Sequence, residues 1–298
     1  MRQQGFGLNS TPYSEKDAPF ALGVVMDQID IATVPKENWD YTGLTIIENQ
    51  QNSDMCGGHA GGAAVEHFDD VPMCKVFQFA TSKWAEGGDI MNYGTNLRAI
   101  GEGMRKIGSL PKADCPHCKL TVDTDDYFGD KWRNINSWPK ESLDIAKQYK
   151  IKSYLWVDKG RYDTFDNIRS ALWKWRDKKQ SIITGVGWRG NWTGAPAGVI
   201  PQEKRDVVGG HAVLIQNKQE IIDGREREVV QNSYGQGIGD DGRFKFDRGV
   251  INRDFTYGAI MPIDLDPEVI RQVYNQITGN GHSKSWWQKL LRFLRFYN

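Results

Sequence analysis

The chain has 298 residues, with 38 basic and 38 acidic side chains, so its formal net charge is zero. This length allows about two domains or one large one, and it is enough to bury a core without disulfide or metal staples. The zero net charge argues against nucleic-acid binding through bulk charge, and no apolar run approaches the roughly 20 residues that span a bilayer. We therefore expect a folded, soluble protein with no nucleic-acid partner.

The amino-terminal segment, residues 1–33, is polar and rich in turn formers, and we expect it to be an extended arm. It lacks a basic stretch followed by an apolar one, so no signal peptide is visible. Four cysteines are too few for a disulfide scaffold in a chain of this length. These features predict synthesis in the cytoplasm, and a place in a larger assembly such as a viral particle is compatible with them.

The first half of the chain predicts helices. Ser53 or Asp54 can cap a helix over 55–68, and a second helix over 74–85 and a third over 95–107 follow. Four glycines in CGGHAGGAAVEHF disfavour a helix, so we expect that a partner or a substrate approaches its backbone closely. A glycine-rich loop is the alternative for this stretch.

The second half predicts strands. After the polar and aromatic segment 119–160 comes a helix over 165–178, and Asp223-Gly224 is a strong hairpin signal. The predicted strands are 181–188, one that begins at 209, 228–234, 242–246 and 257–263. Helices first and antiparallel strands afterwards indicate an α+β architecture with two lobes.

Four side chains in this framework form a candidate catalytic set. Cys56 starts a predicted helix, where the free N–H groups and the helix dipole favour a thiolate. His211 opens a strand after two glycines and can serve as the base, while Asn232 can accept from the second ring N–H and orient that base. The side-chain amide of Gln50 can join the Cys56 backbone N–H in an oxyanion hole.

These segments resemble the papain-like cysteine peptidases. NQQNSDMC (49–56) is similar to the nucleophile segment, GGHAVLI (209–215) to the histidine strand, and QNSYGQGIGDDGRFKF (231–246) to the Asn-Ser-Trp-Gly stretch. Weaker similarity extends over residues 34–263. The resemblance implies a two-lobed fold with a helical left lobe, a strand-rich right lobe and a cleft between them. It also implies that Cys56, His211, Asn232 and Gln50 carry out peptide or isopeptide hydrolysis, with no cofactor and no metal.

Two segments are expected to line the cleft. Tyr93, Gly94 and Thr95 can form backbone hydrogen bonds with an extended peptide substrate, although a plain turn at the start of a helix is the alternative reading. Gly210 and Ala212, which flank His211, are the expected substrate-binding residues of the other wall. A polypeptide is therefore the expected partner.

The sequence departs from the family at two positions near the triad. Gly57 stands where the family usually has Trp, and Tyr234 replaces the Trp that shields the Asn–His hydrogen bond, so we expect a weaker bond and modest activity. No upstream region resembles the inhibitory pro-domain. The Asp223-Gly224 turn also sets a register that pairs Ile215 with Asn232, so bringing His211 to Asn232 requires a β-bulge, which we predict.

Other readings of these residues stay open. Taken alone, Cys56 would be a buried core thiol, because free cysteine is often buried. His59 lies three residues further along the helix and is a rival base, but its side chain should point back along the helix. A catalytically silent assembly protein with this fold and an acyl-transferring enzyme are the alternative functions.

Cys115-Pro-His-Cys118 is a competing motif. A CxxC of this type is the redox motif of thioredoxin-like enzymes, but the strand before it and the helix after it are absent here. With Cys74 it could form half of a zinc site, yet a second ligand pair at metal spacing is missing. We therefore expect a local structural role.

The carboxy-terminal extension, residues 264–298, ends in SWWQKLLRFLRFYN, whose apolar residues recur at helical spacing beside Lys289, Arg292 and Arg295. This pattern predicts a basic amphipathic helix. Docking of residues 282–298 onto this protein or a partner is the preferred reading, and contact with a membrane surface is the alternative.

Overall fold

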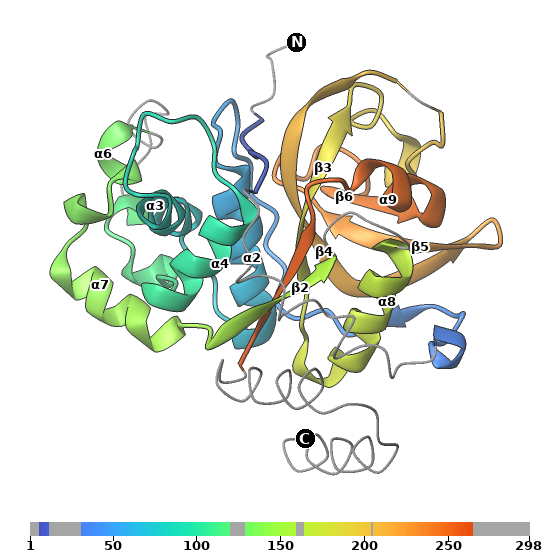
Figure 1. Ribbon diagram of the computed structural model, residues 1–298, viewed down its shortest axis with the longest axis horizontal. Coiled ribbons are helices and arrows are strands. Elements are labelled where there is room, and N and C mark those ends of the chain that lie inside the picture. The colour runs from blue at the N-terminus through green and yellow to red at the C-terminus, as the bar shows by residue number, and fades with distance from the viewer. Residues whose placement is uncertain (1–5, 12–30, 120–128, 159–163, 204, 265–298) are drawn as a thin grey trace, which may run out of the picture.

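The computed structural model describes residues 6–11, 31–119, 129–158, 164–203 and 205–264. Helices gather on one side and strands on the other (Figure 1), which is the two-lobed α+β arrangement expected from the sequence. The predicted basic helix at the carboxy terminus lies outside the described residues. Within the described part of the chain, no helix is both long enough and apolar enough to cross a membrane.

The helical lobe is built around α2 (Cys56–Asp69), α3 (Lys75–Ala85) and α4 (Leu97–Lys106). The shorter α6 (Asp130–Arg133) and α7 (Lys140–Ala146) cover its outer side. Cys74 and Asn96 cap α3 and α4 by accepting hydrogen bonds from backbone N–H groups three residues on. The three long helices agree with the predicted positions to within two residues, whereas α7 was not predicted, because its segment is too polar to show helical periodicity.

Helix α2 packs its glycines against its neighbours, so the glycine-rich loop alternative is wrong. A Cβ on Gly58 would lie 2.5 Å from the Lys75 carbonyl oxygen, and one on Gly57 would lie 2.4 Å from the Thr95 side chain. The predicted cap is also wrong, since the N-cap is Met55 with no side-chain hydrogen bond. The Ser53 hydroxyl instead donates to the Gln50 carbonyl, and the Asp54 carboxylate accepts from Arg133.

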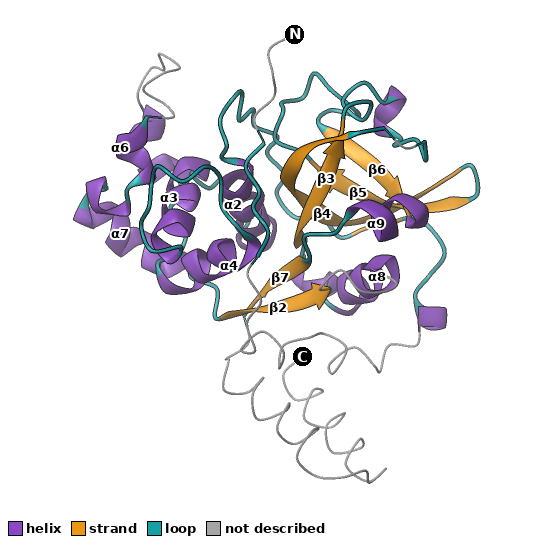
Figure 2. Cartoon of the chain, turned by 45° about the horizontal axis from the view of Figure 1, so that its top comes forward, coloured by secondary structure: helices purple, strands orange, loops and turns teal. Residues whose placement is uncertain are grey.

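The strand lobe contains one antiparallel sheet (Figure 2), ordered β2-β7-β3-β4-β5-β6, with β1 paired to β4. Its strands are β1 (Trp39–Asp40), β2 (Ser153–Asp158), β3 (Ile182–Arg189), β4 (Val207–Ile222), β5 (Arg225–Gln231), β6 (Arg243–Asp247) and β7 (Ala259–Ile263). Helices α8 (Thr164–Lys174) and α9 (Arg248–Asp254) pack beside it. Three of these elements, β1, β2 and α9, were missed from the sequence.

The hairpin between β4 and β5 contains the predicted bulge. Ile222 pairs with Arg225 across the turn, and Gln219 pairs with Glu228 in the same register. Further from the turn Ile215 pairs with Val230, a shift of two positions between Gln219 and Ile215. Such a shift inserts extra residues into one strand, and it moves Asn232 toward the start of β4, where His211 lies.

One apolar core lies within the strand lobe, and another lies between the two lobes. One core lies between the sheet and α8 and α9, and it includes Trp188, Phe244 and Phe246. A second joins α2 and α4 to the inner face of β3 and β4, and it contains Cys56 itself. The candidate nucleophile therefore lies where the helical lobe meets the strand lobe.

Candidate active site

Cys56 begins α2 and is fully buried. The backbone N–H groups of Ala212, Gly7 and Gly57 face its sulfur and lower the pKa of the thiol, but burial outweighs them and raises the pKa to about 11. Among the described residues we see no hydrogen bond between this sulfur and the His211 ring. In this state Cys56 is therefore a neutral thiol.

His211 and Asn232 form the expected pair. His211 Nε2 lies 2.7 Å from Asn232 Oδ1, and both side chains are buried. The same oxygen accepts the Ser233 backbone N–H at 2.7 Å, which identifies it as the acceptor of the amide. Nε2 therefore carries the ring proton, and Nδ1 is the basic nitrogen. Burial lowers the pKa of His211 to about 4, so the ring is neutral.

Two aromatic side chains cover this pair. The Tyr234 ring stacks on the His211 ring with centroids 4.7 Å apart, and Trp188 meets the same ring edge-on at 5.2 Å. His211 is 0% exposed and Asn232 is 3% exposed. The expectation that Tyr234 leaves the hydrogen bond poorly shielded is wrong, because Trp188 on β3 supplies a second cover that sequence reasoning missed.

Gln50 lies at the junction of the two lobes and is anchored at both ends. Its side-chain Nε2 donates to the Ser53 carbonyl at 2.7 Å, and its Oε1 accepts from the Ser233 hydroxyl. The Gln50 backbone N–H donates to the Ser233 carbonyl at 2.7 Å. Ser233 directly follows Asn232 in the chain. Its bonds to Gln50 therefore connect the predicted oxyanion-hole amide to the residue that orients His211.

Residues 6–11, a described part of the amino-terminal arm, lie in the cleft. Residues 6–11 run between α2 and the β3–β4 side of the sheet, shown in dark blue in Figure 1. Leu8 N–H donates to the Gly210 carbonyl at 3.1 Å, and the Leu8 side chain is buried. Phe6 meets the His211 ring edge-on at 6.1 Å. The sequence predicted an arm but nothing about where it binds.

The arm binds the residues that were predicted to bind substrate. Thr95 donates its N–H to the Gly7 carbonyl at 2.8 Å and accepts the Asn9 N–H at 2.7 Å, beside a parallel bridge between this residue and the arm. Asn9 also donates its side-chain N–H to the Tyr93 carbonyl at 2.7 Å. On the opposite wall, Gly210 binds the arm and the Ala212 N–H faces the Cys56 sulfur. Four of the five predicted cleft residues thus contact the arm or this sulfur.

Gly94 is the fifth of these residues, and it owes its position to a buried ion pair. It has φ +71°, and a Cβ there would lie 2.0 Å from the Gly7 carbonyl oxygen. Its N–H donates to Asp54 Oδ2 at 2.6 Å, while Asp54 accepts two hydrogen bonds from Arg133 at 2.6 and 3.0 Å. Sequence reasoning assigned Asp54 to a helix cap and did not single out Arg133, which lies 79 residues away.

His59 shows no sign of being the base. It is buried on α2, and its ring Nε2 has no hydrogen-bond partner among the described residues, whereas the Nε2 of His211 is bound by Asn232. A small enclosed space beside it is lined by parts of α2 and β4 and by Asn232 and Ser233. The Asn232 side-chain Nδ2 has no hydrogen-bond partner among the described residues.

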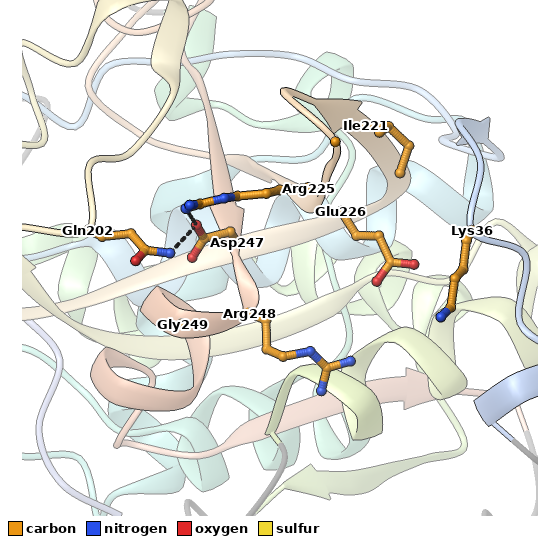
Figure 3. A pocket seen from close by; sticks show the side chains of 9 residues that line it. Lys36, Gln202, Ile221, Arg225, Glu226, Asp247, Arg248 and Gly249 are labelled. Atoms are coloured by element: carbon orange, nitrogen blue, oxygen red, sulfur yellow. Dashed lines mark hydrogen bonds and ion pairs between the residues drawn. The ribbon is translucent and has the colours of Figure 1, made fainter.

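A larger cavity of about 500 Å³ lies on the strand lobe, away from the triad (Figure 3). Four of its five charged side chains, all but Lys36, form ion pairs. Arg225 pairs with Asp247, Arg248 pairs with Asp166, and Glu226 pairs with Arg169. Neither Cys56 nor His211 lines this cavity, so we assign the candidate site to the cleft.

The same fold is found among solved structures, although no protein-family model and no curated protein matches the chain. Xylellain, a cysteine protease from Xylella fastidiosa, has a TM-score of 0.66 at 19% identity, covering 89% of this chain and 97% of its own. Procathepsin B from Trypanosoma congolense has a TM-score of 0.59 at 13% identity, covering 88% of this chain and 86% of its own.

Bromelain from Ananas comosus, in complex with the inhibitor E64, has a TM-score of 0.54 at 17% identity and covers 77% of this chain and 99% of its own. At these identities the likeness concerns the fold. The chain therefore has the papain-like cysteine-protease fold that its sequence resembles.

Proposed function

We propose that this papain-like chain is a cysteine peptidase that hydrolyses peptide or isopeptide bonds in polypeptide substrates. The observation that carries the proposal is the acceptor role of Asn232 Oδ1, which leaves His211 Nδ1 as the basic nitrogen. The backbone N–H of Ala212 faces the Cys56 sulfur. Because Ala212 directly follows His211 in the chain, the candidate base lies near the candidate nucleophile in space.

The reaction proceeds through a thioester. His211 Nδ1 takes the proton of the Cys56 thiol, and the sulfur attacks the carbonyl carbon to form a C–S bond. The C–N bond then breaks as the imidazolium protonates the leaving amine. Water, deprotonated by His211, attacks the thioester carbon, the C–S bond breaks, and the carboxylic acid and the thiol are released.

The oxyanion that forms in each step needs donors that are already in position. The Cys56 backbone N–H and the Gln50 side-chain amide are the proposed donors. Anchoring of Gln50 through Ser53 and Ser233 supports this role, because it prevents the amide from rotating away from the junction between the lobes.

An extended polypeptide is the proposed substrate. The backbone groups of Thr95 and the carbonyl of Gly210 recognise main chain, as the bound arm illustrates. The arm itself turns the Gly7 N–H, rather than a carbonyl carbon, toward the Cys56 sulfur, so it occupies the cleft without offering a scissile bond there. Peptidase activity therefore requires that the arm leave the cleft.

The test is cleavage of fluorescently labelled, denatured casein by the full chain and by a Gly7→Ala variant, whose arm no longer fits. A Cβ at position 7 would lie 2.0 Å from the Asp54 carbonyl oxygen. We expect faster cleavage by Gly7→Ala and none when Cys56→Ala is added.

Labelling the thiols with limiting iodoacetamide at mildly acidic pH provides the second measurement. Cys56 of Gly7→Ala should react selectively, and that selectivity should vanish when His211→Ala is added. An accessible Cys56 that reacts no faster than the other thiols and cuts nothing would indicate a catalytically silent scaffold. Incorporation of an added amine in preference to water would indicate acyl transfer.

A further inference from the structure

Three of the four cysteines converge at one place in the helical lobe, away from the candidate active site. Cys74 caps α3, while Cys115 and Cys118 belong to the CxxC motif some 40 residues later. The Cys74 sulfur lies 3.0 Å from that of Cys115 and 3.4 Å from that of Cys118. All three sulfurs lie within 4.8 Å of one another. The sequence motif did not reveal that Cys74 folds back to meet the other two.

We propose that Cys74, Cys115 and Cys118 bind a zinc ion, and that the neighbouring His117 turns its ring toward the three sulfurs to supply the fourth ligand. Four ligands at Zn–S distances of about 2.3 Å in a tetrahedron place sulfurs about 3.8 Å apart. The Cys74 sulfur, at 3.0 Å from that of Cys115 and 3.4 Å from that of Cys118, would therefore move away from each by less than about 1 Å to admit the ion. The expectation of no metal treated the CxxC motif and Cys74 as only half of a zinc site, whereas the three sulfurs that converge here supply three of the four ligands.

The backbone around the sulfurs is arranged as in a thiolate site. The Cys118 N–H donates to the Cys115 sulfur at 3.1 Å, and the Phe77 N–H donates to the Cys74 sulfur at 3.4 Å. Such N–H donors stabilise the negative sulfur that a metal requires. The cluster thus has two ligands already turned toward a common centre by their own main chain.

His117 is the histidine available to this cluster. It is 1% exposed, and its ring interacts with the Cys115 thiol and lowers the pKa of that thiol. The Trp132 ring packs against it edge-on at 4.9 Å, and Trp138 lies beyond. These rings exclude water from one side of the cluster, while Cys118 is only half-buried and leaves a route for the ion to enter.

A disulfide explains the cluster less well, because it would join only two of the three sulfurs and leave the position of the third cysteine unexplained. Zinc accounts for all three thiols and the histidine. The ion would fasten the loop that carries the CxxC motif to the start of α3, where Cys74 N–H already donates to Leu110 at 2.8 Å and Lys112 N–H to Pro72 at 2.7 Å. Its role is therefore structural, and it lies outside the proposed chemistry of Cys56.

The test is the zinc content of the full chain, purified under reducing conditions, incubated with zinc chloride and dialysed, then measured by plasma mass spectrometry. We expect one equivalent in the wild type and its loss in Cys115→Ser. Cys56→Ala, which removes the one cysteine outside the cluster, is the matched control and should retain the metal. His117→Ala should weaken binding by at least the ~10- to 100-fold that loss of a supporting residue costs.

A measurement on the wild type guards against misfolded variants. Cobalt added in place of zinc should give near-ultraviolet thiolate-to-metal charge-transfer bands and the visible bands of a tetrahedral ion. An intact mass lower by two hydrogens, with a free-thiol count reduced by two under these conditions, would show a disulfide and overturn the proposal. A wild type that holds no more zinc than Cys115→Ser would also overturn it.

Discussion

Leu8 N–H donates to the carbonyl of Gly210, the residue immediately before His211, at 3.1 Å. This bond joins the amino-terminal arm to the strand that carries the candidate base. Together with the Gly7 and Asn9 bonds to Thr95, it holds the arm across both walls of the cleft. Residues 6–11 therefore contribute to the burial that keeps Cys56 and His211 neutral.

Replacing Gly7 with Ala should release the arm. The added Cβ meets the Asp54 backbone at 2.0 Å, a contact that cannot be relieved by a side-chain rotation. With Cys56 exposed to water, its pKa should fall from about 11, because burial is the largest cause of its elevation. Stopped-flow alkylation of Cys56 should become faster and extend to lower pH.

Gly194→Ala is the matched control for this substitution. A Cβ at Gly194 meets nothing within 4 Å, so the variant tests the loss of a glycine without a clash. It should alkylate at the wild-type rate. Equal rates for Gly7→Ala and the wild type would show that the arm does not limit access to Cys56.

Replacing Asn232 with Ala should reduce kcat/KM by about 10²-fold, the cost of a misplaced catalytic group. Without Oδ1, the His211 Nε2–H loses its acceptor and the ring can take either tautomer. The loss should appear mainly in kcat and be measured in the Gly7→Ala background. The exposed Asn136→Ala variant is the control and should leave activity unchanged.

Breaking the buried ion pair by Arg133→Ala should destabilise the fold by about 3–5 kcal/mol, the typical cost of leaving one buried charge without its partner. The Asp54 side chain is 0% exposed and that of Arg133 is 15% exposed. Because Asp54 also holds Gly94, KM for peptide should rise. Urea unfolding measures the stability.

Lys140→Ala removes a surface ion pair with Asp144 and should have little effect on urea unfolding. A small effect of Arg133→Ala that matches this control would mean that the Asp54 pair does not support the helical lobe.

The buried Glu228 should make stability fall as pH rises. Burial raises its pKa to about 8, far above the value of an unfolded chain, so the folded state binds the proton more tightly. Between about pH 4.5 and pH 8 the folded state holds more protons than the unfolded state, and this group then costs stability as pH rises. The expected slope is on the order of 1 kcal/mol per pH unit.

Glu228→Gln removes that dependence and should stabilise the protein above about pH 8 while changing little near pH 4.5. Denaturant unfolding of both proteins across this range measures the difference. Glu203→Gln, at an exposed position, is the control. A difference between Glu228→Gln and the wild type that does not vary with pH would contradict the raised pKa.

Local chemistry allowed much of the fold to be predicted from the sequence. Asn96 caps α4, and Asp223-Gly224 forms the two-residue turn with positive φ at both positions, 52° and 70°. The mismatch between that turn and the pairing of His211 with Asn232 predicted a bulge, which is confirmed between Ile215 and Gln219. Each of these depends on neighbours in the chain or on the two-residue period of a strand.

Only the tertiary structure decided the contacts between residues that lie far apart in the sequence, because no regular spacing relates them. Arg133 reaches Asp54, Trp188 covers His211, Cys74 meets Cys115, and Leu8 binds Gly210. None follows from periodicity or a motif, because each depends on how two lobes and an arm pack in space. The sequence by itself determined which residues could do the chemistry. The packing decided that they are covered, neutral and held in place.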